Sequence, residues 1–103
     1  MIVRIWHGWT SHENAPAYRR LLEQEIFVGI RNREITGFRG IQLLCRGLPD
    51  EVEFVTMMTF DTLAAVREFA GENYEQAVVP PDARALLKRF DKRSAHYEAI
   101  GSA

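Results

Sequence analysis

The sequence predicts an α+β fold in which an antiparallel sheet carries helices on one face. Stretches rich in β-branched and aromatic residues alternate with helical patterns in the order strand, helix, strand, strand, helix, strand. The strand segments are also apolar on both alternating faces, whereas the sheet of an isolated domain usually leaves one face in water. The second apolar face therefore predicts that another subunit covers it. The predicted strands are residues 2–9, 38–46, 51–60 and 94–100.

The chain begins with a predicted strand and a long amphipathic helix. Residues 2–9 alternate between two sets, neither of which is polar enough for a solvated face: Ile2, Trp6 and Gly8 on one side, and Val3, Ile5, His7 and Trp9 on the other. Residues 10–13 have the spacing of a capping box, and Pro16 fits the first turn of a helix. We expect the helix to begin near Asn14 and to end before Thr36-Gly37. Its apolar residues recur at steps of three and four: Tyr18, Leu21, Leu22, Ile26, Phe27 and Ile30.

A hairpin and a shorter helix follow. Residues 38–46 and 51–60 flank a Gly-Leu-Pro-Asp turn at 47–50, and their closeness in the sequence favours antiparallel pairing. Asp61 is expected to cap the second helix, and Gly71 to close it. The inward-facing residues of this helix are Leu63, Val66, Phe69 and Ala70.

The chain is predicted to be irregular between the second helix and the last strand. The two prolines at 80–81 exclude a continuous helix there. A turn capped by Asp82 is expected to hold Leu86 and Leu87. Residues 94–100 then form the last predicted strand.

Length and composition are typical of one globular domain. The 103 residues are 47% hydrophobic and 26% charged, and we expect a single domain over residues 1–100 with a disordered tail at 101–103. The formal net charge is −1, with 13 basic and 14 acidic residues, which gives no broad positive field for a nucleic acid. The single cysteine excludes an internal disulfide. No apolar run approaches the roughly 20 residues of a membrane span, so we expect a cytoplasmic protein without a membrane partner.

The order of elements is that of the ferredoxin-like split βαβ motif, which several functional classes share. An RNA-binding version would carry aromatic and basic residues on the third strand, whereas residues 51–57 are acidic and lack that pattern. A version that carries metal ions would need a pair of cysteines. Neither class is therefore expected.

The three histidines are the residues that first suggest metal or acid–base chemistry. His12 is expected in a solvated loop, and His7 and His96 lie on different strands without a carboxylate at a ligand spacing. A structural role is therefore favoured for His7 and His96, and no metal site is predicted. Trp6 and Trp9 are expected chiefly as core and interface aromatics.

The stretch 72–75 follows the second helix, where a pocket mouth can open between helix and sheet. Tyr74 could reach such a pocket. The structural alternative is that Asn73 caps a helix and Tyr74 packs over an apolar gap.

Four segments carry a family resemblance that covers residues 2–100: Val3-Arg4-Ile5-Trp6-His7-Gly8, the run 50–61, the stretch Phe69-Ala70-Gly71-Glu72-Asn73-Tyr74, and His96-Tyr97-Glu98. Through them the chain resembles the antibiotic biosynthesis monooxygenase family of dimeric α+β barrel proteins. The resemblance implies a homodimer in which two sheets meet face to face. The strands that are apolar on both faces predict the same arrangement independently.

The resemblance also implies what the protein does. Some relatives oxidise polycyclic phenols with dioxygen and without metal or flavin, so the first hypothesis is an oxidoreductase of this kind acting on a small aromatic or polyketide-derived compound. Other barrels of this shape are polyketide cyclases that use a histidine and tyrosines. The third hypothesis is a non-catalytic dimer that binds a small apolar ligand.

Haem-opening relatives use an asparagine on the first strand, a tryptophan on the second helix and a histidine ligand just beyond it. In this chain Trp6 or His7, Phe69 and Val78 take those places. We therefore expect no haem and no other cofactor.

The resemblance singles out eight candidate site residues. His7 as a base and Tyr74 as a hydrogen-bond donor are the catalytic candidates, with Trp6 as a stacking wall and Arg4 as an anion stabiliser. His7 points to the sheet face opposite Arg4 and Trp6, so these residues cannot all line one cleft. The candidate substrate-binding residues are Arg4, Trp6, Trp9, Phe69, Asn73 and His96.

Overall fold

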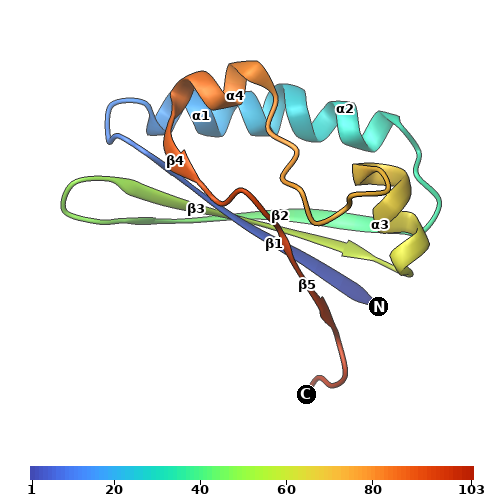
Figure 1. The fold of residues 1–103 in the computed structure, drawn as a ribbon. Helices are drawn as coiled ribbons and strands as arrows, with labels where there is room; N and C mark the ends of the chain where they lie inside the picture. The colour runs from blue at the N-terminus through green and yellow to red at the C-terminus, as the bar shows by residue number, and fades with distance from the viewer.

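A computed structural model describes all residues from 1 to 103 and shows a five-stranded antiparallel sheet with helices on one face (Figure 1). The strands run in the order β2 (Phe38–Gly47), β3 (Val52–Phe60) and β1 (Ile2–Thr10), followed by β4 (Leu87–Phe90) and β5 (Ala95–Glu98), which both pair with β1. The predicted α+β class and the antiparallel hairpin of β2 and β3 are confirmed.

The edge of the sheet beside β1 is formed by two short strands instead of the one that was predicted. β4 pairs with Gly8–Thr10, and β5 pairs with Ile2–Ile5. Residues 91–94 separate the two strands and belong to no strand. Here the Asp91 N–H donates to the His7 carbonyl oxygen at 2.9 Å. The expected strand 94–100 is thus shorter, at Ala95–Glu98.

The first helical segment is one continuous run with a π-helical centre. It consists of α1 (Ala15–Leu21), η1 (Leu22–Ile26) and α2 (Phe27–Asn32). Pro16 lies in the first turn, as predicted. The helix begins at Ala15 with Asn14 at its N-cap position, as expected, and the capping-box spacing of residues 10–13 does not produce a cap. The Ser11 hydroxyl oxygen accepts the Asn14 N–H at 3.0 Å in the preceding turn. The apolar periodicity does not distinguish the π-helical section from the α-helical ones.

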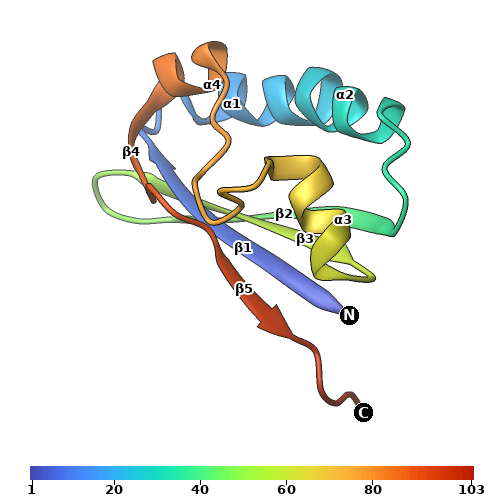
Figure 2. The same ribbon diagram turned by 45° about the vertical axis from the view of Figure 1, so that its right-hand side comes forward.

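Helix α3 (Leu63–Ala70) covers the sheet beside the long helical run (Figure 2). The prediction of Asp61 as its cap is wrong, because the Thr62 hydroxyl oxygen accepts the Ala65 N–H at 3.2 Å. The Asp61 carboxylate is held by the side chain of Arg39 on β2. Gly71 ends the helix as predicted, with a φ of 89° that favours glycine.

Helix α4 (Pro81–Leu86) lies near α1 on the same side of the sheet. Pro80 occupies its N-cap position, so the prediction of an Asp82 cap is wrong. Leu87, which is predicted to lie in the same turn, begins β4 instead. No helix in the chain has the length and hydropathy that crossing a membrane requires.

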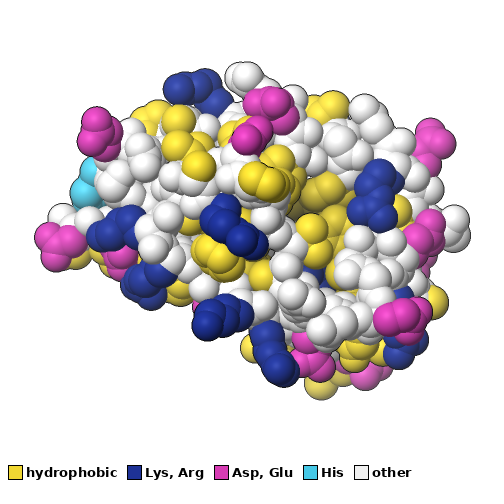
Figure 3. Space-filling model, turned by 45° about the horizontal axis from the view of Figure 1, so that its top comes forward, with side chains coloured by type: hydrophobic (Ala, Val, Ile, Leu, Met, Phe, Trp, Pro, Cys, Tyr) yellow, Lys and Arg dark blue, Asp and Glu magenta, His cyan; other side chains and the backbone are white.

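The buried side chains lie between the helices and the sheet. Figure 3 shows hydrophobic side chains gathered in a hollow of this helix-covered side. The residues that β3 contributes to the core come from alternate positions, as expected for one face of a strand. The two core clusters are Tyr18, Leu22, Val52, Phe54 and Ala83, and Met58, Phe60, Ala65 and Val66.

The opposite face of the sheet has no covering element. On β1 the partly exposed residues of this face are Val3, Ile5, His7 and Trp9. Leu44 on β2 is 46% exposed and Tyr97 on β5 is 57% exposed. We call this surface the open face. Its apolar character follows the sequence pattern, since both alternating sets of β1 are largely apolar.

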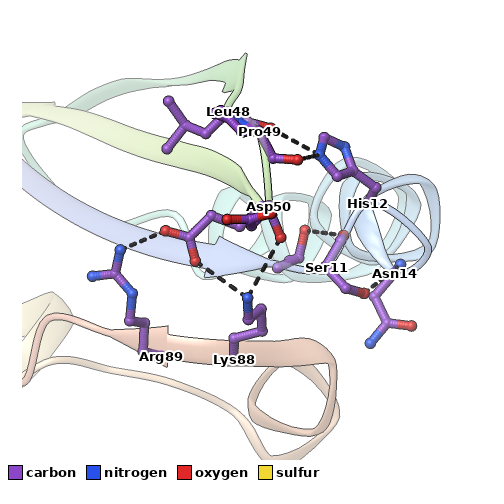
Figure 4. Close-up of polar contacts among 10 residues, drawn as sticks. Ser11, His12, Asn14, Leu48, Pro49, Asp50, Lys88 and Arg89 are labelled. Atoms are coloured by element: carbon purple, nitrogen blue, oxygen red, sulfur yellow. Dashed lines mark hydrogen bonds and ion pairs between the residues drawn. The ribbon is translucent and has the colours of Figure 1, made fainter.

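Polar contacts at one end of the sheet connect three segments (Figure 4). His12 Nε2 lies 2.8 Å from the carbonyl oxygen of Leu48, in the turn between β2 and β3. Arg89 on β4 donates to the carboxylate of Glu51 at 2.6 Å, and this hydrogen bond lowers the pKa of Glu51. His12 is exposed, as predicted, and its ring also forms a hydrogen bond with the turn between β2 and β3.

Candidate functional site

A cavity lies between the sheet and the long helical run. Its volume is about 70 Å³, and 11 of its 15 lining residues are hydrophobic. The sheet contributes Arg4, Trp6 and Thr56, whereas Leu22 and Ile26 come from the π-helical section. Short π-helical sections occur frequently at functional sites. The cavity, with apolar walls and few polar groups, is therefore the candidate functional site.

Strand β1 places Trp6 in the wall of the cavity, and two contacts fix its position. The Trp6 Nε1–H donates to the carbonyl oxygen of Asp91 at 2.7 Å, in the break between β4 and β5. The indole ring also lies over Gly8, where an added Cβ would be 2.7 Å from Trp6 Cη2. A side chain at position 8 would therefore displace the indole.

Arg4 is a buried cation whose contacts include no carboxylate. The residue is 3% exposed. Its Nη1 donates to the Tyr74 carbonyl oxygen and lies 2.9 Å from His96 Nε2, and its Nη2 donates to the Gln76 carbonyl oxygen at 3.2 Å. The guanidinium carbon is 5.4 Å from the centroid of the Phe69 ring, within the range of a cation–π contact. Burial lowers the pKa of Arg4 to about 10, so the side chain stays charged at neutral pH.

His96 is the neutral partner of Arg4. Burial and, to a smaller extent, the charge of Arg4 lower the pKa of His96, while Glu75 acts in the opposite direction. Because Arg4 has only donors, His96 Nε2 must accept, and the proton of the neutral ring lies on Nδ1. The Tyr74 ring packs edge-on against His96, with 5.1 Å between the ring centroids. Tyr74 and His96 thus position Arg4 and do not line the cavity themselves.

His7 and Trp9 lie on the open face, away from the cavity. His7 Nδ1 is 2.9 Å from Asp91 Oδ2. The rings of His7 and Trp9 stack with 6.1 Å between their centroids, and the Arg89 guanidinium carbon lies 3.9 Å from the Trp9 ring centroid. The structure therefore separates the two predicted catalytic residues, since Tyr74 contacts the Arg4 group and His7 is on the other side of the sheet.

The remaining predicted residues divide in the same way. Phe69 lines the cavity from α3. Asn73 is exposed and donates to the Gln76 side chain at 3.3 Å, outside the cavity, and it caps no helix. Sequence reasoning missed two polar lining residues, Thr56 and Ser94. The alternation of β3 assigns Thr56 to the helix-covered face, but nothing local indicates that Ser94 is only 5% exposed.

The residues of the cavity do not fit a haem. No histidine or cysteine lines the cavity, and Val78 stands where the resemblance would place a ligand. The volume of about 70 Å³ is also far below that of a porphyrin site. No group of three or more histidine, cysteine, aspartate or glutamate side chains is arranged to hold a metal ion.

Neither protein-family models nor curated proteins match this chain. Solved structures do match it. A candidate antibiotic biosynthesis monooxygenase from Bacillus cereus has a TM-score of 0.67 at 12% identity, covering 99% of this chain and 95% of that one. Another from Deinococcus radiodurans has a TM-score of 0.65 at 17% identity, covering 100% and 96%. A protein from Mycobacterium tuberculosis has a TM-score of 0.66 at 19% identity, covering 99% and 97%. Over nearly its whole length, the chain has the fold of proteins named as antibiotic biosynthesis monooxygenases.

Proposed function

We propose that the chain is a monooxygenase-like oxidoreductase that oxidises a small aromatic compound with dioxygen, without metal or flavin. The observation that carries the proposal is a cavity with aromatic side chains in its walls and one buried cation, Arg4. The fold shared with proteins named as monooxygenases supports it.

The reaction that we propose needs no electron source besides the substrate. A phenol with a free para carbon and dioxygen give a quinone and water, so the substrate supplies all the electrons and both hydrogens of the water. Trp6 and Phe69 would hold the ring, and the positive charge of Arg4 would offset a negative charge on the substrate. The apolar walls would exclude bulk water from the reacting pair.

The volume of the cavity restricts the substrate to a small molecule. About 70 Å³ is room for a few water molecules, well below the 300–1,000 Å³ that is typical of sites for drug-sized ligands. A single ring would therefore need some movement of the side chains at the mouth, such as Val78, which is 51% exposed. A compound with one ring is favoured over a polycyclic one.

Of the residues predicted from the sequence, Arg4, Trp6 and Phe69 are the proposed substrate contacts. Tyr74 and His96 are proposed as positioning residues for Arg4. A cyclase that used His7 together with Tyr74 receives no support from the geometry, because His7 lies on the other face of the sheet.

Dioxygen uptake by the metal-stripped protein tests the proposed function. The panel should contain single-ring phenols and quinols together with anthrones, and we expect uptake with a single-ring compound. Arg4→Met should abolish this uptake, whereas Arg19→Met, on the outer side of α1, should leave it unchanged. No uptake above a heat-denatured control with any compound would count decisively against an oxygenase.

We also propose that a second copy of the chain covers the open face. The apolar residues of this face include Val3 and Ile5 on β1, Val55 on β3 and the half-exposed Leu44 on β2. Their burial against a copy of the same surface would remove apolar area from water.

Sedimentation at micromolar concentration tests the dimer. We expect the mass of two chains for the native protein and a single-chain mass for Leu44→Glu. Val28→Glu introduces the same charged residue on α2, on the helix side of the sheet, and should leave the dimer intact. Val28 is 38% exposed. A native protein of single-chain mass would refute the dimer.

A further inference from the structure

We infer that the cavity binds its substrate as a carboxylate, so that the substrate is an aromatic acid with one ring whose carboxylate lies against Arg4, Thr56 and Ser94. The inference deepens the proposed function by naming the substrate class, and it rests on that function for the oxidation that follows binding. The binding of the acid itself stands on the following observations.

Arg4 has hydrogen-bond donors that the protein does not use. Arg4 has five N–H groups, and three of them point at acceptors of the protein, namely two carbonyl oxygens and one imidazole nitrogen. Nε has no acceptor in the protein. Every fully buried side-chain nitrogen or oxygen atom has a hydrogen-bond partner, so Nε, which has none, must be accessible. Arg4 is also one of the residues that line the cavity.

Two hydroxyl groups accompany Arg4 in the lining of the cavity. Thr56 lies directly across from Trp6 on β3, and Ser94 directly precedes β5. Ser94 is 5% exposed, and neither hydroxyl has a hydrogen-bond partner in the protein, so both reach accessible space as Nε does. The Nε–H group of Arg4 and the two hydroxyl groups are hydrogen-bond donors in the lining of one cavity, which suits a carboxylate.

The charge of Arg4 lacks a counter-ion on the protein. A buried charge is costly unless a charged or strongly hydrogen-bonded partner compensates it. Arg4 forms no ion pair, and no aspartate or glutamate lines the cavity. The partners that it has, two carbonyl oxygens and one neutral imidazole, carry no net charge. An anionic ligand would supply the missing charge.

The lining of the cavity favours a carboxylate over a phenolate. A phenol such as tyrosine has a pKa of about 10, so it enters the cavity neutral and needs a base to ionise. No aspartate, glutamate or histidine lines the cavity, and the Nε2 lone pair of His96 is directed at Arg4. A carboxylic acid is already ionised at neutral pH and needs no base.

Calorimetric titration of the full chain at pH 7.5 with benzoate, benzamide and phenol tests the inference. The three probes present a similar ring with an anionic, a neutral amide and a neutral hydroxyl group. We expect benzoate to bind at least about tenfold more tightly than either neutral probe, as a charge-assisted hydrogen bond predicts. Phenol binding more tightly than benzoate would overturn the carboxylate, and so would equal affinities or no benzoate binding at about 10 mM.

Three variants locate the anion. Ser94→Ala and Thr56→Val remove single hydroxyl groups while retaining Arg4, and each should weaken benzoate binding severalfold without changing benzamide binding. Arg4→Met should remove the preference for benzoate. If Arg4→Met does not fold, the two hydroxyl variants decide, and unchanged benzoate binding in both would overturn the site.

The binding assay separates this inference from the proposed function. Titration needs no turnover. If benzoate binds but no hydroxybenzoate causes dioxygen uptake, the carboxylate site is supported and the oxygenase activity is refuted. Dioxygen uptake with neutral phenols alone, together with weak benzoate binding, would do the reverse.

Discussion

The two faces of β1 differ in what covers them, although both are apolar in sequence. Arg4 and Trp6 lie under the helices and line the cavity. His7 and Trp9, one position away along the strand, lie on the open face and are partly exposed. The same alternation of side chains therefore creates a sheltered cavity on one side and a surface without a cover on the other.

Electrostatics differ between the two faces as well. On the covered face, Arg4 has only uncharged partners in the protein. On the open face, His7 lies 2.9 Å from the Asp91 carboxylate, and Arg89 beside Trp9 is paired with Glu51. Arg89 on the open face thus has a carboxylate partner, whereas Arg4 in the cavity lacks one. This difference supports the proposal of a ligand site on the covered face.

The largest expected effect is a difference in the free energy of unfolding between substitutions of two neighbouring methionines of β3. Met58 is 4% exposed under the helices, and Met57 is partly exposed on the open face. We expect Met58→Ala to lower the free energy of unfolding by about 2–5 kcal/mol, because it leaves a cavity in the core. Met57→Ala should cost less, about 1 kcal/mol, and its effect should depend on protein concentration if a second copy covers this face. Urea unfolding at two protein concentrations measures both. Equal losses at every concentration would contradict the contrast.

A smaller effect is expected from a pair of glycines. Gly8→Ala should destabilise the fold by about 1–3 kcal/mol, because the new methyl group would push Trp6 toward the cavity. Gly29→Ala should stabilise the fold by about 1 kcal/mol, because the position is helical and exposed and an added Cβ would meet no other part of the protein within 4 Å. Thermal unfolding followed by tryptophan fluorescence compares them. If both variants were equally stable, the indole could not lie over Gly8.

The third prediction concerns the pH dependence that His96 contributes. Because its pKa is lowered in the folded state, the unfolded chain binds more protons below pH 6.5, and the folded state loses stability as the pH falls from that value. Protonation would also remove the acceptor for Arg4. In His96→Gln, whose side-chain oxygen can accept from Arg4, this part of the loss should disappear.

Urea unfolding of both proteins at pH 7.5, 6.5 and 5.5 checks the prediction for His96. The carboxylates titrate in both proteins and cancel in the comparison. Identical pH profiles would show that His96 is not a neutral partner of Arg4.

The smallest effect is expected at His7. His7→Gln keeps a polar side chain beside Asp91, and we expect benzoate affinity and any dioxygen uptake to stay within about twofold of the native values, since the residue lies across the sheet from the cavity. Tyr74→Phe is the comparison variant for the other predicted catalytic residue. It leaves the backbone carbonyl oxygen that accepts from Arg4 in place. A large loss of activity in His7→Gln alone would move the chemistry to the open face.

Much of the architecture can be predicted from the sequence because strand and helix periodicities are local. The two-residue period of β1 places Arg4 and Trp6 on one face and His7 and Trp9 on the other, whatever the distant parts of the chain do. The cap of α3 shows the limit of local patterns. Asp61 and Thr62 are both good capping residues, and the salt bridge from Arg39 on the neighbouring strand holds the aspartate away from that role.

The candidate site could be predicted only in part. Arg4, Trp6 and Phe69 follow from the resemblance and the strand pattern, whereas Thr56 and Ser94 do not. Polar residues of this size are common in strands and loops, so nothing in their own sequence neighbourhood distinguishes them. Their common place in the lining of the cavity emerges only when distant segments enclose one space.

By itself, the sequence determined the order of the elements from β1 to α3 and the face on which each side chain of β1 lies, since these depend on residues within a few positions of one another. Only the tertiary structure decided that the edge strand breaks at Asp91, and that the chain near Tyr74 and His96 meets Arg4 from 70 and 92 positions away. Contacts over such distances depend on how the whole chain packs, because helix and strand patterns specify neighbours along the chain and not partners across it.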